Sequence, residues 1–353
     1  MRRKKAPKAP GVENKVVRRP VTVVTGFLGS GKTTLLSKVL AEPAMANTAV
    51  LVNEFGEVGL DHHLLRRVDK RTVLLGNGCV CCTTREDLAS ALMELLGMDE
   101  RGEIPRLDRV VIETTGLADP APILHTIFTD TVLQHHFSVD FVLTTVDAVN
   151  GHPHLDRNPE SVKQAAAADK VIVTKTDLAE PGLVGPLISR LNALNPSAQI
   201  LEAAFGDVDL QDLLRPNGME TAMDFVELSG EPHHTQDTHS VSVTFDGAVD
   251  WAAFGIWFSM LLHARGEDVL RVKGFLDVGE TGPVVLNGVQ HVIHPPEHLD
   301  EWPDEDRRSR IVFITKGIRA DELLASLQAF RNLLGARPIP LRTAQSPAMP
   351  GLR

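Results

Sequence analysis

Short apolar runs alternate with helix-forming segments over the first two thirds of the chain. β-branched and aliphatic residues dominate these runs, as in Val21–Thr25, Arg109–Ile112 and Lys170–Thr174. Such runs indicate strands buried on both faces, and the helices between them indicate a mostly parallel sheet covered by helices, an α/β fold. The pattern predicts strands at 21–25, 49–52, 71–75, 109–112, 139–145, 170–174 and 199–203, with helices at 34–41, 87–96, 161–168 and 182–194.

A different pattern begins at Ser240, after a stretch rich in Gly, Pro, Asp and His that indicates a linker. Alternation over Val241–Phe245 predicts a strand, and Asn287-Gly288 predicts a hairpin turn between antiparallel strands. Helices are expected at 251–263 and 320–334, so the second unit is α+β. Aromatic residues at helical spacing are expected in its core, namely Trp251, Phe254, Trp257 and Phe258.

The segment Gly26–Thr33 fits G-x-x-x-x-G-K-[ST], the P-loop of a P-loop NTPase, between a predicted strand and a predicted helix. Glycines let backbone N–H groups surround phosphate oxygens, and the helix N-terminus adds the positive end of its dipole. Lys32 can reach the β- and γ-phosphates, and the Thr33 hydroxyl can bind Mg²⁺. The residues expected to contact the nucleotide here are Gly26, Gly29, Ser30, Gly31, Lys32, Thr33 and Thr34.

A second polar signal follows the strand that ends at Ile112. A carboxylate at Glu113 can orient Mg²⁺ or its water from across the phosphates, and Gly116 can offer its N–H to the γ-phosphate. We therefore expect Lys32 and Glu113 to be the catalytic residues.

A third signal, Thr174-Lys175-Thr176-Asp177, follows the next buried strand but one. The Asp177 carboxylate can accept hydrogen bonds from guanine N1–H and the 2-amino group, a donor pair that adenine lacks on that edge. Lys175 can lay its methylene stem over the base. Thr174 stands where the usual guanine motif has Asn, which is expected to weaken the contact with the base edge. These residues predict GTP rather than ATP as the nucleotide.

Composition narrows the possible partners. The chain has 353 residues and a formal net charge of −10, which argues against a nucleic-acid binder. No apolar run reaches the roughly 18 residues of a membrane span, so no membrane partner is expected. The basic start of the chain lacks the apolar core of a secretory signal and predicts a disordered tail. A cytoplasmic location is therefore expected.

All three cysteines lie in one short segment, Cys79-Val80-Cys81-Cys82. This crowded, odd-numbered set is a poor disulfide framework and indicates metal binding by thiolates. Thiolates favour Zn²⁺ or Cu(I). A fourth ligand could come from Glu57, a histidine, water or the protein that receives the metal.

Five motifs in this order closely resemble the CobW-type P-loop GTPases, a zinc-associated metallochaperone family with a GTPase domain and a CobW C-terminal domain. The resemblance covers about residues 20–335 and implies a GTPase that uses GTP and Mg²⁺ and delivers Zn²⁺ or another metal to a client protein. It also implies that Asn53–Asp61 is switch I and Glu113–Gly116 is Walker B with switch II. The motifs are Gly26–Thr34, Asn53–Gly59, Gly78–Cys82, Glu113–Pro120 and Thr174–Asp177.

The expected organisation is a disordered tail (1–19), a P-loop GTPase domain (20–228), a His-containing linker (229–239), a CobW-type α+β domain (240–336) and a second tail (337–353). With three histidines in its last seven residues, the linker is weak support for metal storage.

The motif order suggests that GTP and Mg²⁺ order the switch loops and so change the metal's coordination, if Glu57 is a ligand. Three alternatives remain open. The chain could be a dedicated maturation factor for one metalloenzyme or for cobalamin synthesis, a non-catalytic metal-binding protein, or a small-molecule kinase. A monomer or a homodimer fits each of them.

Overall fold

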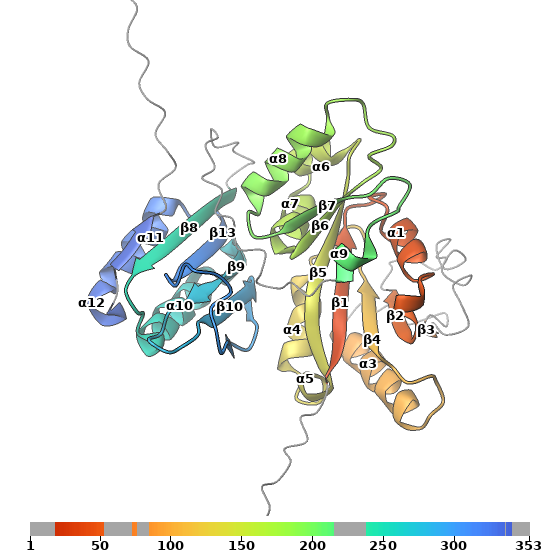
Figure 1. Ribbon diagram of the computed structural model, residues 1–353, viewed down its shortest axis with the longest axis horizontal. Helices are drawn as coiled ribbons and strands as arrows, with labels where there is room; N and C mark the ends of the chain where they lie inside the picture. Colours follow the sequence, from red (N-terminus) through yellow and green to blue (C-terminus); the bar gives the residue numbers. More distant parts are fainter. Residues whose placement is uncertain (1–17, 53–72, 76–84, 215–237, 336, 341–353) are drawn as a thin grey trace, which may run out of the picture.

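The computed structural model describes residues 18–52, 73–75, 85–214, 238–335 and 337–340. Within these ranges the chain forms two β-sheets, each of seven strands, with helices packed against both (Figure 1). No helix in the described ranges is long and apolar enough to cross a membrane.

The first sheet has the strand order β3-β2-β4-β1-β5-β6-β7, and every pairing in it is parallel. This confirms the predicted α/β class and the predicted strands. The strands are β1 (Arg19–Gly26), β2 (Thr48–Val52), β3 (Val73–Leu75), β4 (Arg109–Glu113), β5 (Phe137–Asp147), β6 (Lys170–Thr174) and β7 (Gln199–Glu202).

Helices cover both faces of this sheet. Leu35 and Leu36 of α1 share a core with Leu213 of α9 on one face. On the other face, buried residues of α3, α4, α7 and α8 pack against the strands. The helices are α1 (Lys32–Val39), α3 (Arg85–Glu100), α4 (Ala121–Thr129), α5 (Leu133–His136), α6 (Gly151–Arg157), α7 (Pro159–Ala167), α8 (Val184–Leu194) and α9 (Leu210–Leu214).

The second sheet is antiparallel, with the order β11-β10-β9-β13-β8-β14, and β12 pairs with β10. Helices α10 (Trp251–Arg265), α11 (Ala320–Ala329) and α12 (Arg331–Leu334) cover one face. Phe254, Trp257 and Phe258 are buried there, as predicted, and Trp251 is partly buried. The strands are β8 (Thr238–Asp246), β9 (Val269–Leu276), β10 (Val284–Val289), β11 (Val292–Ile293), β12 (Glu297–His298), β13 (Arg310–Lys316) and β14 (Arg337–Pro340).

The predicted hairpin turn at Asn287-Gly288 is wrong. Both residues lie inside β10, and the chain turns two residues later, where Gln290 adopts a φ of +53°. Gly288 is closely packed: a Cβ there would lie 2.4 Å from Ile293 Cδ1 and 3.2 Å from Val292 O. The glycine therefore marks tight packing inside the hairpin, which resembles a turn signal in the sequence.

The predicted C-terminal tail also needs a correction. Residues 337–340 form β14, which pairs with β8 at the edge of the second sheet. This segment contains two prolines, and an edge strand tolerates residues that cannot donate a backbone hydrogen bond. Strand β8 begins at Thr238, inside the expected linker. The expected tails at 1–17 and 341–353, and linker residues 229–237, lie outside the described residues.

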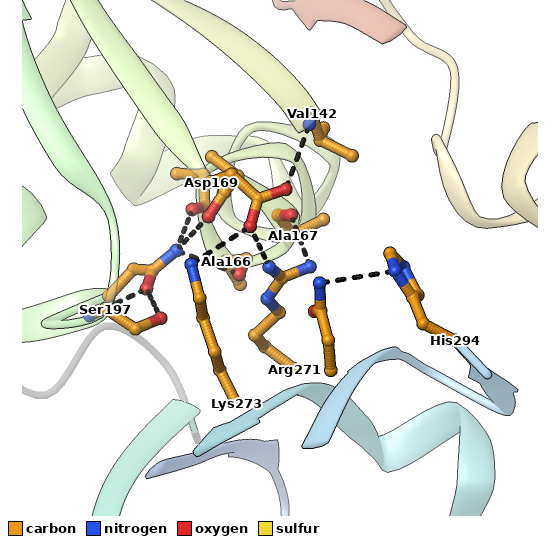
Figure 2. Close-up of polar contacts among 12 residues, drawn as sticks. Val142, Ala166, Ala167, Asp169, Ser197, Arg271, Lys273 and His294 are labelled. Carbon is orange, nitrogen blue, oxygen red and sulfur yellow. Dashed lines mark hydrogen bonds and ion pairs between the residues drawn. The ribbon is translucent and has the colours of Figure 1, made fainter. Parts of the chain in front are cut away.

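A buried ionic cluster joins the two sheets (Figure 2). Asp169, between α7 and β6, is 2% exposed and accepts hydrogen bonds from Val142 N (3.0 Å) and Lys273 Nζ (3.2 Å). Arg271, fully buried on β9, donates to the same carboxylate and to Ala167 O. Burial alone would raise the pKa of Asp169, but Arg271 and Lys273 hold this pKa well below its usual range. The aspartate is therefore ionised.

An extra residue in β9 aims Arg271 at this carboxylate. The β9–β13 register shifts beside Arg271. Val269 and Val272 pack with α10, whereas Leu270 joins the core of α7 and α8. A β-bulge lets two successive residues, here Leu270 and Arg271, face the same neighbour. The second sheet thus presents both an apolar and a cationic contact to the first.

We expect Asp169→Asn to lower the free energy of unfolding by about 3–5 kcal/mol, because it leaves Arg271 buried without a counter-charge. Urea denaturation followed by circular dichroism measures this change. Asp156→Asn is the matched control: Asp156 is 61% exposed and pairs with Arg190 at the surface. Its loss is expected to change stability by about 0–1 kcal/mol. Equal effects of the two variants would contradict the importance of the buried cluster.

Candidate functional site

Polar side chains gather at the carboxyl edge of the first sheet. Strands β1, β4, β5 and β6 are neighbours and run in the same direction, so their last residues lie along one edge (Figure 1). Ligands of open parallel sheets bind at this edge. The last residues of these four strands are Gly26, Glu113, Asp147 and Thr174.

The P-loop backbone needs its glycines. Gly26 has a φ of +141°, and a Cβ there would lie 2.3 Å from Thr145 Oγ1. Gly31 has a φ of +91° and is the N-cap of α1. Residues with a side chain rarely adopt these backbone conformations, so glycine is what lets the loop turn into the helix N-terminus. The Ser30 hydroxyl lies 2.6 Å from Thr145 Oγ1, which fastens the loop to β5.

Lys32 lies under this loop and is 8% exposed. Its Nζ donates to Gly26 O at 2.9 Å and to Phe27 O at 3.3 Å. The ammonium group is therefore held against the carbonyl oxygens at the start of the P-loop, where a phosphate chain of a nucleotide would bring negative charge.

Thr33, in the first turn of α1, contacts Glu113, the last residue of β4. Thr33 Oγ1 donates to Glu113 Oε1 at 2.8 Å, and Glu113 is 4% exposed. The parallel register explains the contact, because Glu113 pairs with Val24 just before the P-loop begins. The two residues that the sequence assigns to Mg²⁺ thus lie in direct contact. An alcohol and a carboxylate oxygen are the donor types that Mg²⁺ prefers.

Gly116 packs directly against the P-loop. A Cβ on Gly116 would lie 2.7 Å from Leu28 N, so this close approach requires glycine. Gln164 of α7 donates from Nε2 to Gly116 O (3.2 Å) and to Ala118 O (3.0 Å). The loop after β4 is therefore held between the P-loop and α7.

Thr174 joins the third motif to the first. It is 3% exposed, and its Oγ1 donates to Ser30 O at 2.6 Å. A second acceptor, Val146 O, lies at 3.3 Å. The residue that departs from the usual guanine motif thus ties its own loop to the P-loop through a buried hydrogen bond.

Lys175 has a φ of +58° and its Nζ lies 2.8 Å from Asp147 Oδ2. Burial alone would raise the pKa of Asp147, but hydrogen bonds from Lys175, Asn150 and the Val149 N–H lower it below its usual value. An ionised Asp147 therefore holds the Lys175 side chain in place.

Asp177 is exposed, and its Oδ1 accepts a hydrogen bond from the Phe205 N–H at 2.8 Å. Phe205 follows β7, so this contact brings the loop after β7 against the loop after β6. The carboxylate that is expected to select guanine thus lies at the surface and is oriented by a backbone donor.

The expected metal ligands lie outside the described residues. These are Cys79, Cys81, Cys82 and Glu57, together with the expected switch I segment at 53–61. Among the residues that are described, no group of three or more His, Cys, Asp or Glu side chains is arranged to hold a metal ion. Strands β2 and β3 precede these two segments of the sequence. They are adjacent and parallel, and they end at the edge of the sheet that carries Glu113.

Sequence reasoning missed four residues that build this site. Thr145 and Asp147 lie at the end of the long strand β5. Their position, as polar residues that follow an apolar run, could have indicated them. Gln164 lies in an alanine-rich helix and Phe205 in a loop without a recognised motif, so neither could be placed before the fold was known.

Two family models match the chain. The CobW/HypB/UreG nucleotide-binding domain matches residues 20–202, and the cobalamin synthesis protein cobW C-terminal domain matches residues 238–331. The zinc chaperone YjiA of Escherichia coli (strain K12) is 35% identical over 317 residues, which cover 88% of this chain and 98% of that protein. The zinc chaperone CobW of Pseudomonas aeruginosa is 32% identical, and the match covers 85% of this chain and 88% of that protein.

Among solved structures, the crystal structure of Zn(II)-bound YjiA GTPase from E. coli matches with a TM-score of 0.69 and 31% identity. The match covers 89% of this chain and 99% of that one. The similarity therefore extends over both sheets.

We expect Thr174→Val to lower the free energy of unfolding by about 1–3 kcal/mol, because it removes the buried hydrogen bond to Ser30 O. Thr174→Ser keeps the hydroxyl, and its free energy of unfolding is expected to fall by less. Urea denaturation compares the two variants. If Thr174→Val and Thr174→Ser were equally stable, the hydrogen bond to Ser30 O would not be what holds the two loops together.

Proposed function

The chain belongs to the CobW/HypB/UreG family of nucleotide-binding proteins, and from this membership and the site geometry we propose that it is a GTP-hydrolysing zinc chaperone. In this proposal GTP binds at the carboxyl edge of the first sheet and Zn²⁺ binds at the cysteine segment. The client is a metalloprotein that receives the zinc. The relatives named zinc chaperones and the structure of a Zn(II)-bound GTPase support the assignment.

The contact between Thr33 and Glu113 carries the nucleotide part of this proposal. Their oxygens lie 2.8 Å apart at the mouth of the P-loop. Thr33 would bind Mg²⁺ directly, and Glu113 would bind the ion or one of its waters. The ion would neutralise charge on the β- and γ-phosphate oxygens.

The residues around the P-loop have separate roles in GTP hydrolysis. The amides of the loop and the N-terminus of α1 bind the phosphates, and Lys32 exchanges its bonds to Gly26 O and Phe27 O for phosphate oxygens. The Gly116 N–H contacts the γ-phosphate. Water attacks the γ-phosphorus, the bond to the β-phosphate oxygen breaks, and GDP and inorganic phosphate leave. Binding and orientation supply most of the catalysis in such sites.

Guanine selectivity is assigned to Asp177, whose carboxylate accepts from N1–H and the 2-amino group. Thr174 does not contact the base in this proposal. Its bond to Ser30 O fixes the position of the Thr174–Asp177 loop relative to the phosphate site.

The zinc site is assigned to Cys79, Cys81 and Cys82, with Glu57 as the fourth ligand. Strands β2 and β3 lead into the segments that carry these residues, and β2 pairs with β4 so that Val52 lies opposite Glu113. Nucleotide and metal segments therefore begin at the same edge of the sheet. GTP binding would order the switch loops and change zinc affinity, and hydrolysis would release them. By linkage, bound zinc must change GTP affinity by the same factor.

Thr33→Val is expected to lower the GTPase rate roughly 100-fold and to raise the Mg²⁺ concentration needed for half-maximal rate, because it removes one oxygen ligand. Phosphate release at varied Mg²⁺ concentration measures both effects. The hydroxyl is retained in Thr33→Ser, the matched control, which is expected to stay close to wild type.

A Thr33→Val variant with unchanged rate and Mg²⁺ dependence would contradict the assignment of Thr33 to the metal. A Lys32→Ala variant tests whether zinc delivery depends on GTP hydrolysis. If it loses GTP hydrolysis but still delivers zinc at the wild-type rate, zinc delivery does not depend on GTP hydrolysis.

Cys81→Ser/Cys82→Ser is expected to lower zinc affinity by more than about 100-fold, because even outer-shell changes cost 10–100-fold in metal sites. Competition with a chromogenic zinc chelator, in the presence of GDP and of a non-hydrolysable GTP analogue, measures the affinity in both states. The histidine pair of α5 provides the control, since His135→Ala/His136→Ala removes two metal-binding side chains from another part of the protein.

Glu57→Ala tests the fourth ligand in the same assay, and Glu54→Ala, three residues earlier, is its comparison. A loss of affinity at Glu54 but not at Glu57 would reassign the ligand. Zinc affinities that are equal with GDP and with the GTP analogue would rule out the proposed coupling.

A further inference from the structure

Phe205 is an exposed aromatic residue at the edge of the nucleotide site. It is 70% exposed, more than any other large apolar side chain in the described part of the chain. The residue lies in the loop between β7 and α9. An exposed phenylalanine ring gains no free energy from burial in this state. A bound ligand that covers the ring would supply this free energy.

The backbone at Phe205 is also unusual. Its φ is +53°, in the left-handed region that a bulky residue rarely adopts, and Gly206 follows with a φ of +79°. Strain of this kind persists only where the surroundings impose it, and it concentrates at ligand sites.

The surroundings of this turn are well defined. Ala203 N donates to Val173 O at 2.8 Å, which ties the start of the turn to β6. Asp207 N donates to Ala204 O at 2.8 Å, and the Asp207 carboxylate pairs with Lys38 of α1. A Cβ on Gly206 would lie 3.2 Å from Thr34 Cγ2. The turn is therefore held between the P-loop helix and β6.

The same turn contacts the carboxylate that is assigned to guanine. Phe205 N–H donates to Asp177 Oδ1 at 2.8 Å. Each carboxylate oxygen can accept two hydrogen bonds, so Asp177 retains the capacity to bind the two donors of guanine. The phenyl ring thus belongs to the residue whose amide orients the carboxylate that is assigned to the base.

We propose that the Phe205 ring stacks on the guanine base of bound GTP, while Asp177 binds the edge of the base. This inference rests on the proposed GTP site. Every base has a π-face, so the ring contributes affinity for the base without selecting among bases, and Asp177 supplies the selectivity. The proposal accounts for both observations on Phe205. Bound nucleotide would cover the exposed ring, and the left-handed turn would direct the ring toward the base.

The test compares equilibrium affinities of wild type, Phe205→Ala and Phe205→Trp for three ligands with Mg²⁺: GTP, inosine triphosphate and inorganic tripolyphosphate. Phe205→Ala is expected to weaken GTP and inosine triphosphate by the same factor, roughly 5- to 30-fold, or about 1–2 kcal/mol. Tripolyphosphate has no base, and its affinity is expected to stay unchanged, which also shows that the variant is folded. Ile256→Ala, which truncates a 60% exposed side chain on α10, is the matched control.

Phe205→Trp adds a spectroscopic readout. Its fluorescence is expected to change with GTP and not with tripolyphosphate, because only GTP places a base on the indole ring. The native Trp residues lie in the second sheet unit and its loops, so their signal is measured in wild type and subtracted.

Equal GTP affinity for wild type and Phe205→Ala would overturn the stacking role. An equal loss for GTP and tripolyphosphate would overturn it as well, because the loss would not come from the base. If wild type itself bound tripolyphosphate but no GTP, the proposed GTP site would fail, an outcome distinct from either result.

Discussion

The parallel pairing of β1 with β4 and β5 determines where the chemistry of this protein lies. Parallel strands bring their carboxyl ends to one edge, so residues far apart in sequence, such as Thr33 and Glu113, come within hydrogen-bond distance. The same pairing sets Thr145 behind the P-loop, where it leaves no room for a side chain at Gly26. The glycines, the lysine and the acidic residue lie together because of this register.

Buried hydrogen bonds between loops then give the site its shape. Thr174 holds its loop to the P-loop through Ser30 O, and Asp147 holds Lys175 through an ion pair. Gln164 holds the carbonyls of Gly116 and Ala118. The bonds from Thr174 to Ser30 O and from Gln164 to Gly116 O are buried, and removing one partner of a buried bond leaves the other unsatisfied at a larger cost than the bond itself is worth. The binding edge is therefore pre-organised by its own polar contacts.

The second sheet adheres to the first through charge as well as apolar contact. Asp169 lies at the amino end of β6, at the opposite end of that strand from Thr174, and it holds Arg271 and Lys273 of β9 (Figure 2). At a separate point Gln290 donates to Asp119 at 2.5 Å, in the loop that follows Glu113 and Gly116. The turn that carries Gln290 thus contacts the loop that follows the expected switch II segment, and the two sheets meet both at the base of the first sheet and near its carboxyl edge.

The sequence alone determined the α/β class and the strands of the first sheet, and it predicted which residues would gather around the P-loop. Apolar runs and a P-loop between a strand and a helix are local patterns, and local patterns are visible without the fold. The tertiary structure decided what depends on distant contacts. Thr174 looked like a weakened base contact and is a tether to Ser30, because its hydroxyl can be assigned only once β6 lies beside the P-loop.

Gly288 looked like a turn residue and is packed against Ile293, and residues 337–340 were expected in a tail and form an edge strand that pairs with β8. Phe205 had no signal at all in the sequence. Its position beside Asp177 arises where the loops after β6 and β7 meet, and only parallel pairing brings those loops together.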